Sequence, residues 1–107
     1  MKYFNLKELI KSTIAIAKGI INVPNKNEEA NLIALVDNVL DPLREAYGKP
    51  IIVTSGYRSE QLNRMIGGAK TSQHVKGQAV DIRSVEDTYE ENKKLFDLIV
   101  KLNLPFD

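Results

Sequence analysis

A stripe of apolar residues between about Asn27 and Tyr47 constrains the fold of this chain most. Its members recur every three or four positions: Leu32, Leu35, Val36, Val39, Leu40 and Leu43. This spacing places them on one face of a long helix, which has to pack against other parts of the fold. Pro42 has no backbone donor and is predicted to kink the last turns, and Gly48 with Pro50 predicts the helix end.

Two segments are predicted to be strands. Ile51–Thr54 is β-branched throughout, which is typical of a buried strand. Ala79–Arg83 alternates between apolar and polar residues, so Val80 and Ile82 should face the core while Asp81 lies on the opposite face. The strands are separated by a predicted short helix that Ser59 begins and that runs through Ile66.

Helices are also predicted at both ends of the chain. Asn5 and Glu8 have the spacing of a capping box, so a short helix should begin there. Residues 11–24 fit more than one structure, and 22–27 is predicted to be a loop. Asp87 and Glu90 offer a second capping box, for a final helix that ends near Pro105. The apolar stripe of that helix consists of Leu95, Leu98, Ile99 and Leu102, and its glutamates are expected on the solvated face, namely Glu86, Glu90 and Glu91.

The order of these elements predicts an α+β fold, a small sheet with helices packed on it, in one domain over residues 1–107. Two strands alone make a marginal sheet. The chain also stops at Leu104–Asp107, directly after a predicted helix end, where a returning strand would be expected. We therefore expect the last strand or strands to be missing and the natural protein to be longer, with a frayed end here.

The composition excludes several classes of function. The formal charge is +1 with scattered Lys and Arg, which gives no basis for nucleic-acid binding. No apolar run approaches the roughly 20 residues that a membrane-spanning helix needs, and the start does not resemble a secretory signal. The chain has no cysteine, so thiolate metal sites are excluded. We expect a monomer without membrane contact, either cytoplasmic or released by phage-type lysis.

His74 is the only histidine, and Asp81 follows seven positions later. Imidazole nitrogen and carboxylate oxygen are both good zinc ligands, and a loop histidine could meet an aspartate that projects from a strand if Gly77 allows the turn. The alternatives are a surface or hydrogen-bonded histidine, and an aspartate paired with Arg83 or Lys76.

The segment Ser72–Asp81 fits the pattern Ser-x-His-x-x-Gly-x-Ala-x-Asp in full. Upstream, Thr54–Ser59 reads Thr-Ser-Gly-Tyr-Arg-Ser, and Asn63 is followed by Gly67-Gly68-Ala69. Together these segments resemble the M15 peptidase family, zinc D-alanyl-D-alanine carboxypeptidases and their relatives, and in particular its small phage-type peptidoglycan peptidases. The resemblance covers roughly residues 4–107 and implies a fold like that of D,D-peptidases and Hedgehog domains.

The resemblance implies a role for each matching residue. His74 and Asp81 match two zinc ligands, and Arg58 matches an arginine that stabilises the oxyanion of the tetrahedral intermediate. A permanently charged, forked donor suits that task. The alternative for Arg58 is a salt bridge with Asp41 or Glu60.

Ser72 matches a residue that lines the substrate cleft, and the alternative is a turn or cap residue. Gly67, Gly68 and Gly77 are interpreted as residues that shape the backbone. The family's third ligand, a histidine, and its general-base glutamate occur in a later segment, preceded in the relatives by a Phe-Asp pair that matches Phe106–Asp107. Neither is present here, so we expect weak or absent Zn²⁺ binding and doubtful activity for this chain, and one ion in the complete protein.

The complete protein is thus predicted to hydrolyse cell-wall peptides as a zinc peptidase. A non-catalytic module that binds the same peptides remains the alternative. The sequence does not reveal which peptide bond is cleaved, nor the biological role.

Overall fold

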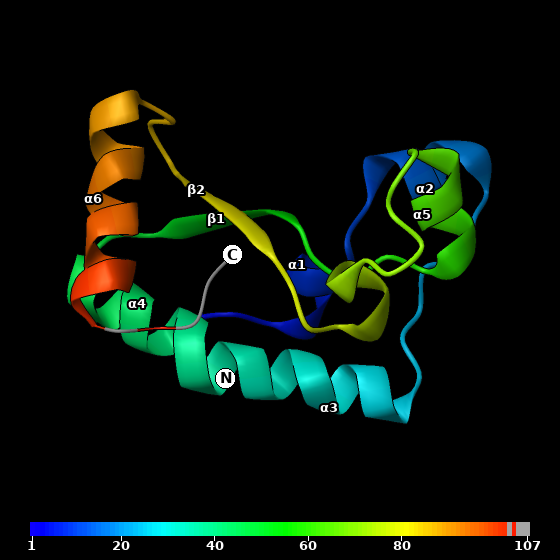
Figure 1. The fold of residues 1–107 in the computed structure, drawn as a ribbon, viewed down its shortest axis with the longest axis horizontal. Helices are drawn as coiled ribbons and strands as arrows, with labels where there is room; N and C mark the ends of the chain where they lie inside the picture. The colour runs from blue at the N-terminus through cyan, green and yellow to red at the C-terminus, as the bar shows by residue number, and fades with distance from the viewer. Residues whose placement is uncertain (103, 105–107) are drawn as a thin grey trace.

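The long helix lies along one side of the molecule, below the sheet in Figure 1. The computed structural model describes residues 1–102 and 104. α3 (Lys26–Leu35), the π-helical turn η1 (Val36–Leu40) and α4 (Asp41–Tyr47) follow one another without a break. Asn25 begins α3 with a complete capping box, and Gly48 ends α4 at φ 76°. The prediction of a helix between about 27 and 47 is confirmed.

Next to Pro42, where a kink was predicted, the structure has this π-helical turn. Pro42 has no N–H to donate to the carbonyl group of Asn38, four residues earlier. The chain widens into η1 directly before Pro42, so the helical path continues through the proline.

The sheet consists of β1 (Ile51–Ser55) and β2 (Asp81–Ser84), which pair antiparallel. Val53 pairs with Ile82 and Ser55 pairs with Asp81, so Thr54 is an extra residue in β1. Such a β-bulge bends the strand and redirects the side chains beside it. β2 begins two residues later than predicted, but Val80 and Ile82 pack against the core as expected.

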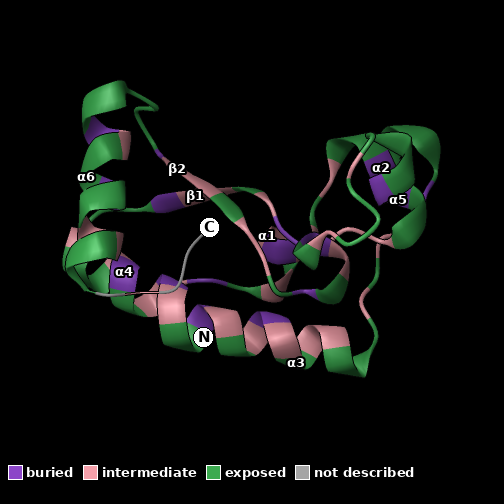
Figure 2. Ribbon diagram, viewed as in Figure 1, coloured by how far each residue is buried: buried purple, intermediate pink, exposed green. Residues whose placement is uncertain are grey.

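The main core fills the space between the sheet and the helices α1 (Leu6–Ile10), α3, η1, α4 and α6 (Tyr89–Lys101). Figure 2 shows the buried residues along the inner faces of these elements. The core side chains are Phe4, Leu9, Leu32, Val36, Leu40, Leu43, Ile51, Tyr57 and Leu95. Helices packed on a small antiparallel sheet make this an α+β fold, as predicted.

Two predictions for α6 are wrong. Asp87 and Glu90 do not form the capping box: Thr88 is the N-cap and accepts from the N–H of Glu91, while the Asp87 carboxylate accepts from Asn92. Asp87 has φ 52°, so the chain turns at this residue and α6 begins one residue later than expected.

Glu91 does not lie on a solvated face either. It is buried, with its carboxylate 2.6 Å from Lys49 Nζ and 2.8 Å from Lys94 Nζ. Of the predicted apolar stripe, Leu95, Leu98 and Ile99 contact the core, but Leu102 is exposed. The stripe ends there because Leu102 is the C-cap, where the helical periodicity stops.

A smaller lobe contains α2 (Thr13–Lys18) and α5 (Glu60–Met65), at the right of Figure 1. Its own apolar cluster consists of Ala15, Ile20 and Leu62. The predicted helix caps at Asn5 and Ser59 are both confirmed. None of the helices in the described part of the chain is long and apolar enough to cross a membrane. The Phe106–Asp107 pair and the expected fraying lie outside the described residues.

Candidate metal and peptide site

His74 lies on the 3₁₀ turn η2 (Gln73–Lys76), which packs against α3. Its side chain is buried, and its Nδ1 is 2.7 Å from the backbone carbonyl oxygen of Gly56. A carbonyl oxygen only accepts, so Nδ1 has to donate and to carry the proton. In the neutral ring the lone pair is then on Nε2, the atom that faces Asp81.

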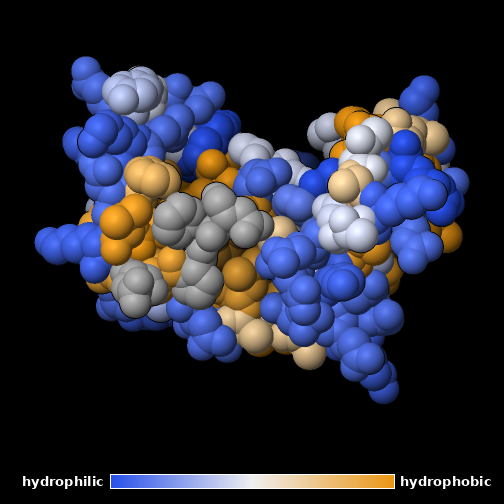
Figure 3. All heavy atoms as spheres, viewed as in Figure 1, coloured by the Kyte–Doolittle hydropathy of each residue, from blue (hydrophilic) through white to orange (hydrophobic). Residues whose placement is uncertain are grey.

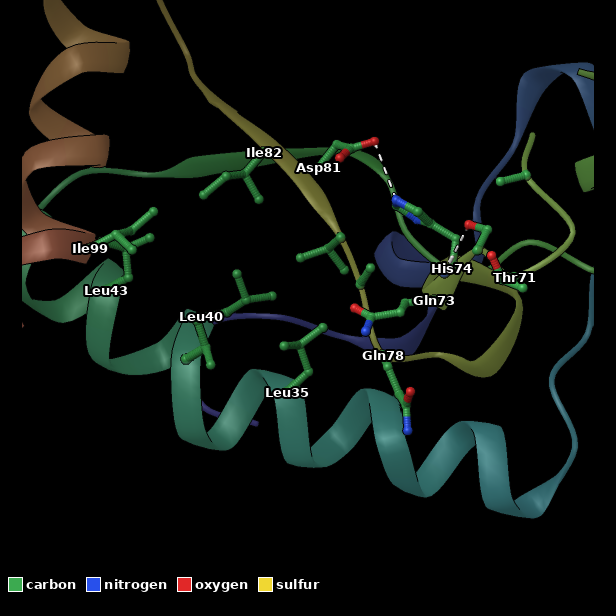
Figure 4. Close-up of a pocket in the computed structure, with 15 residues that line it drawn as sticks. Leu35, Leu40, Leu43, Thr71, Gln73, His74, Gln78, Asp81, Ile82 and Ile99 are labelled. Carbon is green, nitrogen blue, oxygen red and sulfur yellow. Dashed lines mark hydrogen bonds and ion pairs between the residues drawn. The ribbon is translucent and has the colours of Figure 1, made fainter. Parts of the chain in front are cut away.

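Asp81 is the first residue of β2 and lies opposite the bulge in β1. Its backbone carbonyl accepts from the hydroxyl of Thr54, the extra residue. Its carboxylate is largely exposed, and Oδ2 is 3.5 Å from His74 Nε2. Figure 4 shows the two groups facing each other across the upper edge of a groove.

The separation of these two atoms fits a shared metal ion. A distance of 3.5 Å is long for a direct hydrogen bond. Two ligands that are each about 2.1 Å from a tetrahedral zinc ion lie about 3.4 Å apart. The hydrogen bond from Nδ1 to a backbone carbonyl is also typical of histidines that bind metals through Nε2.

In the part of the chain that the structure describes, no group of three or more His, Cys, Asp or Glu side chains could hold a metal ion. His74 and Asp81, the ligands predicted from the sequence, lie close together as a pair and not as part of such a group. Asp81 is not paired with Arg83, whose Nη1 donates to the carbonyls of Ser84 and Val85. His74 is not an exposed surface histidine, since its side chain is buried, but the alternative of a hydrogen-bonded histidine fits its bond to Gly56.

The groove beside this pair has a volume of about 800 Å³ and two chemically different ends. One end is apolar and is formed by helix residues and by the inner face of β2. The other end is polar and lies around η2, where Thr71, Gln73 and Gln78 line it together with His74 and Asp81. In Figure 3 apolar atoms occupy the middle of this face, with mainly hydrophilic residues to their right. No pattern in the sequence indicated a role for these polar lining residues, although Gln73 and Gln78 lie within the Ser72–Asp81 motif.

Ser72 also lines the groove, and it caps η2 at the same time. Its Oγ accepts from the backbone N–H of His74 at 3.3 Å. Ser72 can therefore be a cap residue and a cleft-lining residue at once, since the oxygen that accepts from the His74 N–H belongs to a side chain that borders the groove.

Arg58 is joined to His74 through the backbone, because its N–H donates to the His74 carbonyl at 3.1 Å. It does not line the groove. Its Nε is buried without a hydrogen-bond partner among the described residues. No ion pair joins Arg58 to Asp41 or Glu60 in that part of the chain, and the Asp41 carboxylate accepts from backbone N–H groups near the N-terminus instead.

Two glycines make this arrangement possible. Gly77 ends η2 at φ 73°, and a Cβ there would clash with the backbone carbonyl of Glu28. A Cβ on Gly56 would clash with the backbone of Leu9. These close approaches hold η2 against α3 at Gly77 and the backbone at Gly56 against α1. Tyr57, next to Gly56, is buried. Its burial, and to a smaller extent the negative charge of Glu28, raises the pKa of the Tyr57 hydroxyl to about 12.

Comparison with known proteins identifies the family of this chain. The family model described as Peptidase M15 matches residues 2–99. The match covers nearly the whole chain, so the protein belongs to the peptidase M15 family. No curated protein and no solved structure matches the chain.

Proposed function

We propose that this protein is a zinc-dependent peptidase of the D,D-carboxypeptidase or endopeptidase type that acts on bacterial cell-wall peptides. In this proposal His74 and Asp81 are metal ligands, Arg58 stabilises the oxyanion, and Ser72 contacts the peptide. The membership of the M15 family supports a peptidase. The single observation that carries the metal assignment is the 3.5 Å separation of Nε2 and Oδ2, with Nδ1 already committed to Gly56.

The residues of the chain prepare the site in three ways. The Gly56 carbonyl holds the proton of His74 on Nδ1 and keeps Nε2 free to bind. The bulge at Thr54 brings the Asp81 carboxylate to the groove edge. The polar end of the groove offers Ser72, Gln73 and Gln78 as hydrogen-bonding partners for peptide groups.

Zinc bound at such a site would lower the pKa of its water and polarise the scissile carbonyl. The guanidinium of Arg58 carries a permanent positive charge and forked donors, which match the charge that develops on a tetrahedral oxyanion. Arg58 would have to turn its side chain toward the groove when a peptide binds, since it does not line the groove in this structure.

The first test is a calorimetric zinc titration of the natural gene product, read to its stop codon. His74→Ala and Asp81→Ala should each weaken zinc binding by more than the 10–100-fold typical of changes around a metal's ligands. Asp97→Ala is the matched control, because among the described residues this exposed aspartate pairs only with Lys93 on α6, and it should leave affinity unchanged. No zinc binding, or no loss with His74→Ala, would refute the metal assignment.

The second test separates the enzyme from a non-catalytic module. Muropeptides incubated with the zinc-loaded protein should be cleaved, as followed by mass spectrometry, and Arg58→Ala should reduce kcat about 10²–10³-fold. Peptide binding without cleavage would favour the module. For the 107-residue chain alone, we expect only weak zinc binding, since its described part offers two ligands. A submicromolar site at neutral pH would contradict this.

A further inference from the structure

The segment Gly56–Ser59 carries both the carbonyl that orients His74 and the proposed oxyanion residue Arg58. It is irregular backbone, since it follows the end of β1 and precedes α5. Its position relative to His74 therefore depends on tertiary hydrogen bonds rather than on a helix or sheet ladder. Two of these bonds are between backbone groups: Tyr57 N–H donates to the Leu9 carbonyl, and Arg58 N–H donates to the His74 carbonyl.

Two further bonds to this segment come from the side chain of Asn22. Its Nδ2 donates to the Tyr57 carbonyl at 3.0 Å, and its Oδ1 accepts from the Ser59 N–H at 2.7 Å. One carboxamide thus binds the peptide groups on both sides of Arg58. The same Nδ2 donates to the Ile10 carbonyl at 2.8 Å, which ties the clamp to the end of α1.

The geometry points to Asn22 as a positioning residue of the site. We propose that its carboxamide fixes the Gly56–Ser59 segment, and with it the orientation of the His74 ring and the position of Arg58. The functional meaning of this inference rests on the proposed function, but the clamp, namely the hydrogen bonds of Asn22 to Ile10, Tyr57 and Ser59, can be tested independently. A carboxamide suits the task because it offers a donor and an acceptor on one rigid plane. In sequence the residue lies in a segment predicted only as a loop.

Asn92 provides a matched control at the other end of the molecule. Its Oδ1 accepts from the buried Ser84 N–H at 2.8 Å, and its Nδ2 donates to the Asp87 carboxylate at 3.0 Å. Asn92→Ala therefore removes the same kind of side chain and an equivalent backbone contact, away from η2 and Arg58. Any general loss of stability should appear in both variants.

The experiment is an NMR comparison of metal-free wild type, Asn22→Ala, Asn22→Asp and Asn92→Ala, all at a pH where imidazole is neutral. Because His74 is the only histidine, its two ring nitrogens give one unambiguous ¹⁵N pair. Wild type and Asn92→Ala should show a proton on Nδ1 and a bare Nε2. Both Asn22 variants should shift this tautomer equilibrium toward Nε2–H.

Amide hydrogen exchange gives the second readout. In the Asn22 variants the Arg58 amide, whose own acceptor is the His74 carbonyl, should exchange about tenfold faster, as expected when a bond of ordinary strength loosens. A purely local role would affect Ser59, which loses its acceptor, and leave Arg58 and the His74 ring unchanged. That result would overturn the proposal, and so would an equal response to Asn92→Ala.

If an Asn22 variant fails to fold, hydrogen exchange of the wild-type protein still tests the clamp. The Ser59 amide should then be as protected as the Ser84 amide, and a freely exchanging Ser59 would overturn the clamp. If the protein binds no zinc, the proposed function is refuted. If the Asn22 variants of that protein still lose the His74 signature, the clamp is nevertheless supported.

Discussion

The two ends of this molecule are held together by different forces. Around α4, α6 and the sheet, the structure depends on apolar side chains that are almost completely buried. Around η2 and the Gly56–Ser59 segment, burial of Tyr57 is joined by polar side chains bonded to backbone groups, from Asn22, Ser59, Ser72 and His74. Apolar burial stabilises without specifying orientation, whereas hydrogen bonds fix the direction of each group. The half that has to orient ligands is therefore the half built from directional contacts.

The largest effect expected from this contrast is on global stability. Leu95→Ala removes a buried side chain of α6 that does not line the groove, and should lower the free energy of unfolding by about 2–5 kcal/mol. Urea unfolding measures the loss. The His74 ¹⁵N signature should stay that of wild type below the transition. A changed tautomer in the folded variant would break the separation between the two ends.

A smaller but local effect is expected at Gly77. Alanine in its left-handed conformation costs about 1–2 kcal/mol, and the added Cβ would push η2 away from the Glu28 carbonyl. Gly77→Ala should therefore both destabilise the fold and disturb the His74 signals. Gly19→Ala is the control, because Gly19 has φ 66° but open space around it, so it should cause the strain without the displacement. Identical His74 spectra in the two variants would argue against packing of η2 as a determinant of the site.

The smallest effect concerns the one buried ionic group of α6. Hydrogen bonds from Lys49 and then Lys94 lower the pKa of Glu91 from 4.5 to about 2. Because the pKa of Glu91 is lower in the folded than in the unfolded state, its ionised form stabilises the fold at any pH above the unfolded-state pKa of 4.5. This contribution is lost as the pH falls from 4.5 towards about 2. Glu91→Gln should remove this part of the pH dependence, measured by urea unfolding at pH 6 and pH 3. Equal pH dependence in both proteins would show that Glu91 contributes nothing to acid sensitivity.

Much of the framework was predictable because it follows from local patterns. The caps at Asn5 and Ser59 and the strand β1 form as expected. The predicted stripe is in the core at Leu32, Val36, Leu40 and Leu43, whereas Leu35 and Val39 line the groove. The predicted Asp87–Glu90 capping box does not form because two candidate caps lie side by side: Thr88 caps the helix, and Asp87 accepts from Asn92 five positions later. The prediction that Glu91 is solvated was wrong because helical spacing does not indicate that Lys49, from a distant segment, lies beside it.

The sequence by itself determined the family, the α+β class and the identity of the candidate ligands, because these depend on residue types at fixed spacing. Only the tertiary structure decided how the candidates meet. The bulge at Thr54, the bond from His74 to Gly56 and the reach of Asn22 across 37 positions to Ser59 join segments far apart in the chain. Such contacts depend on how the chain packs, and packing is a property of the whole fold.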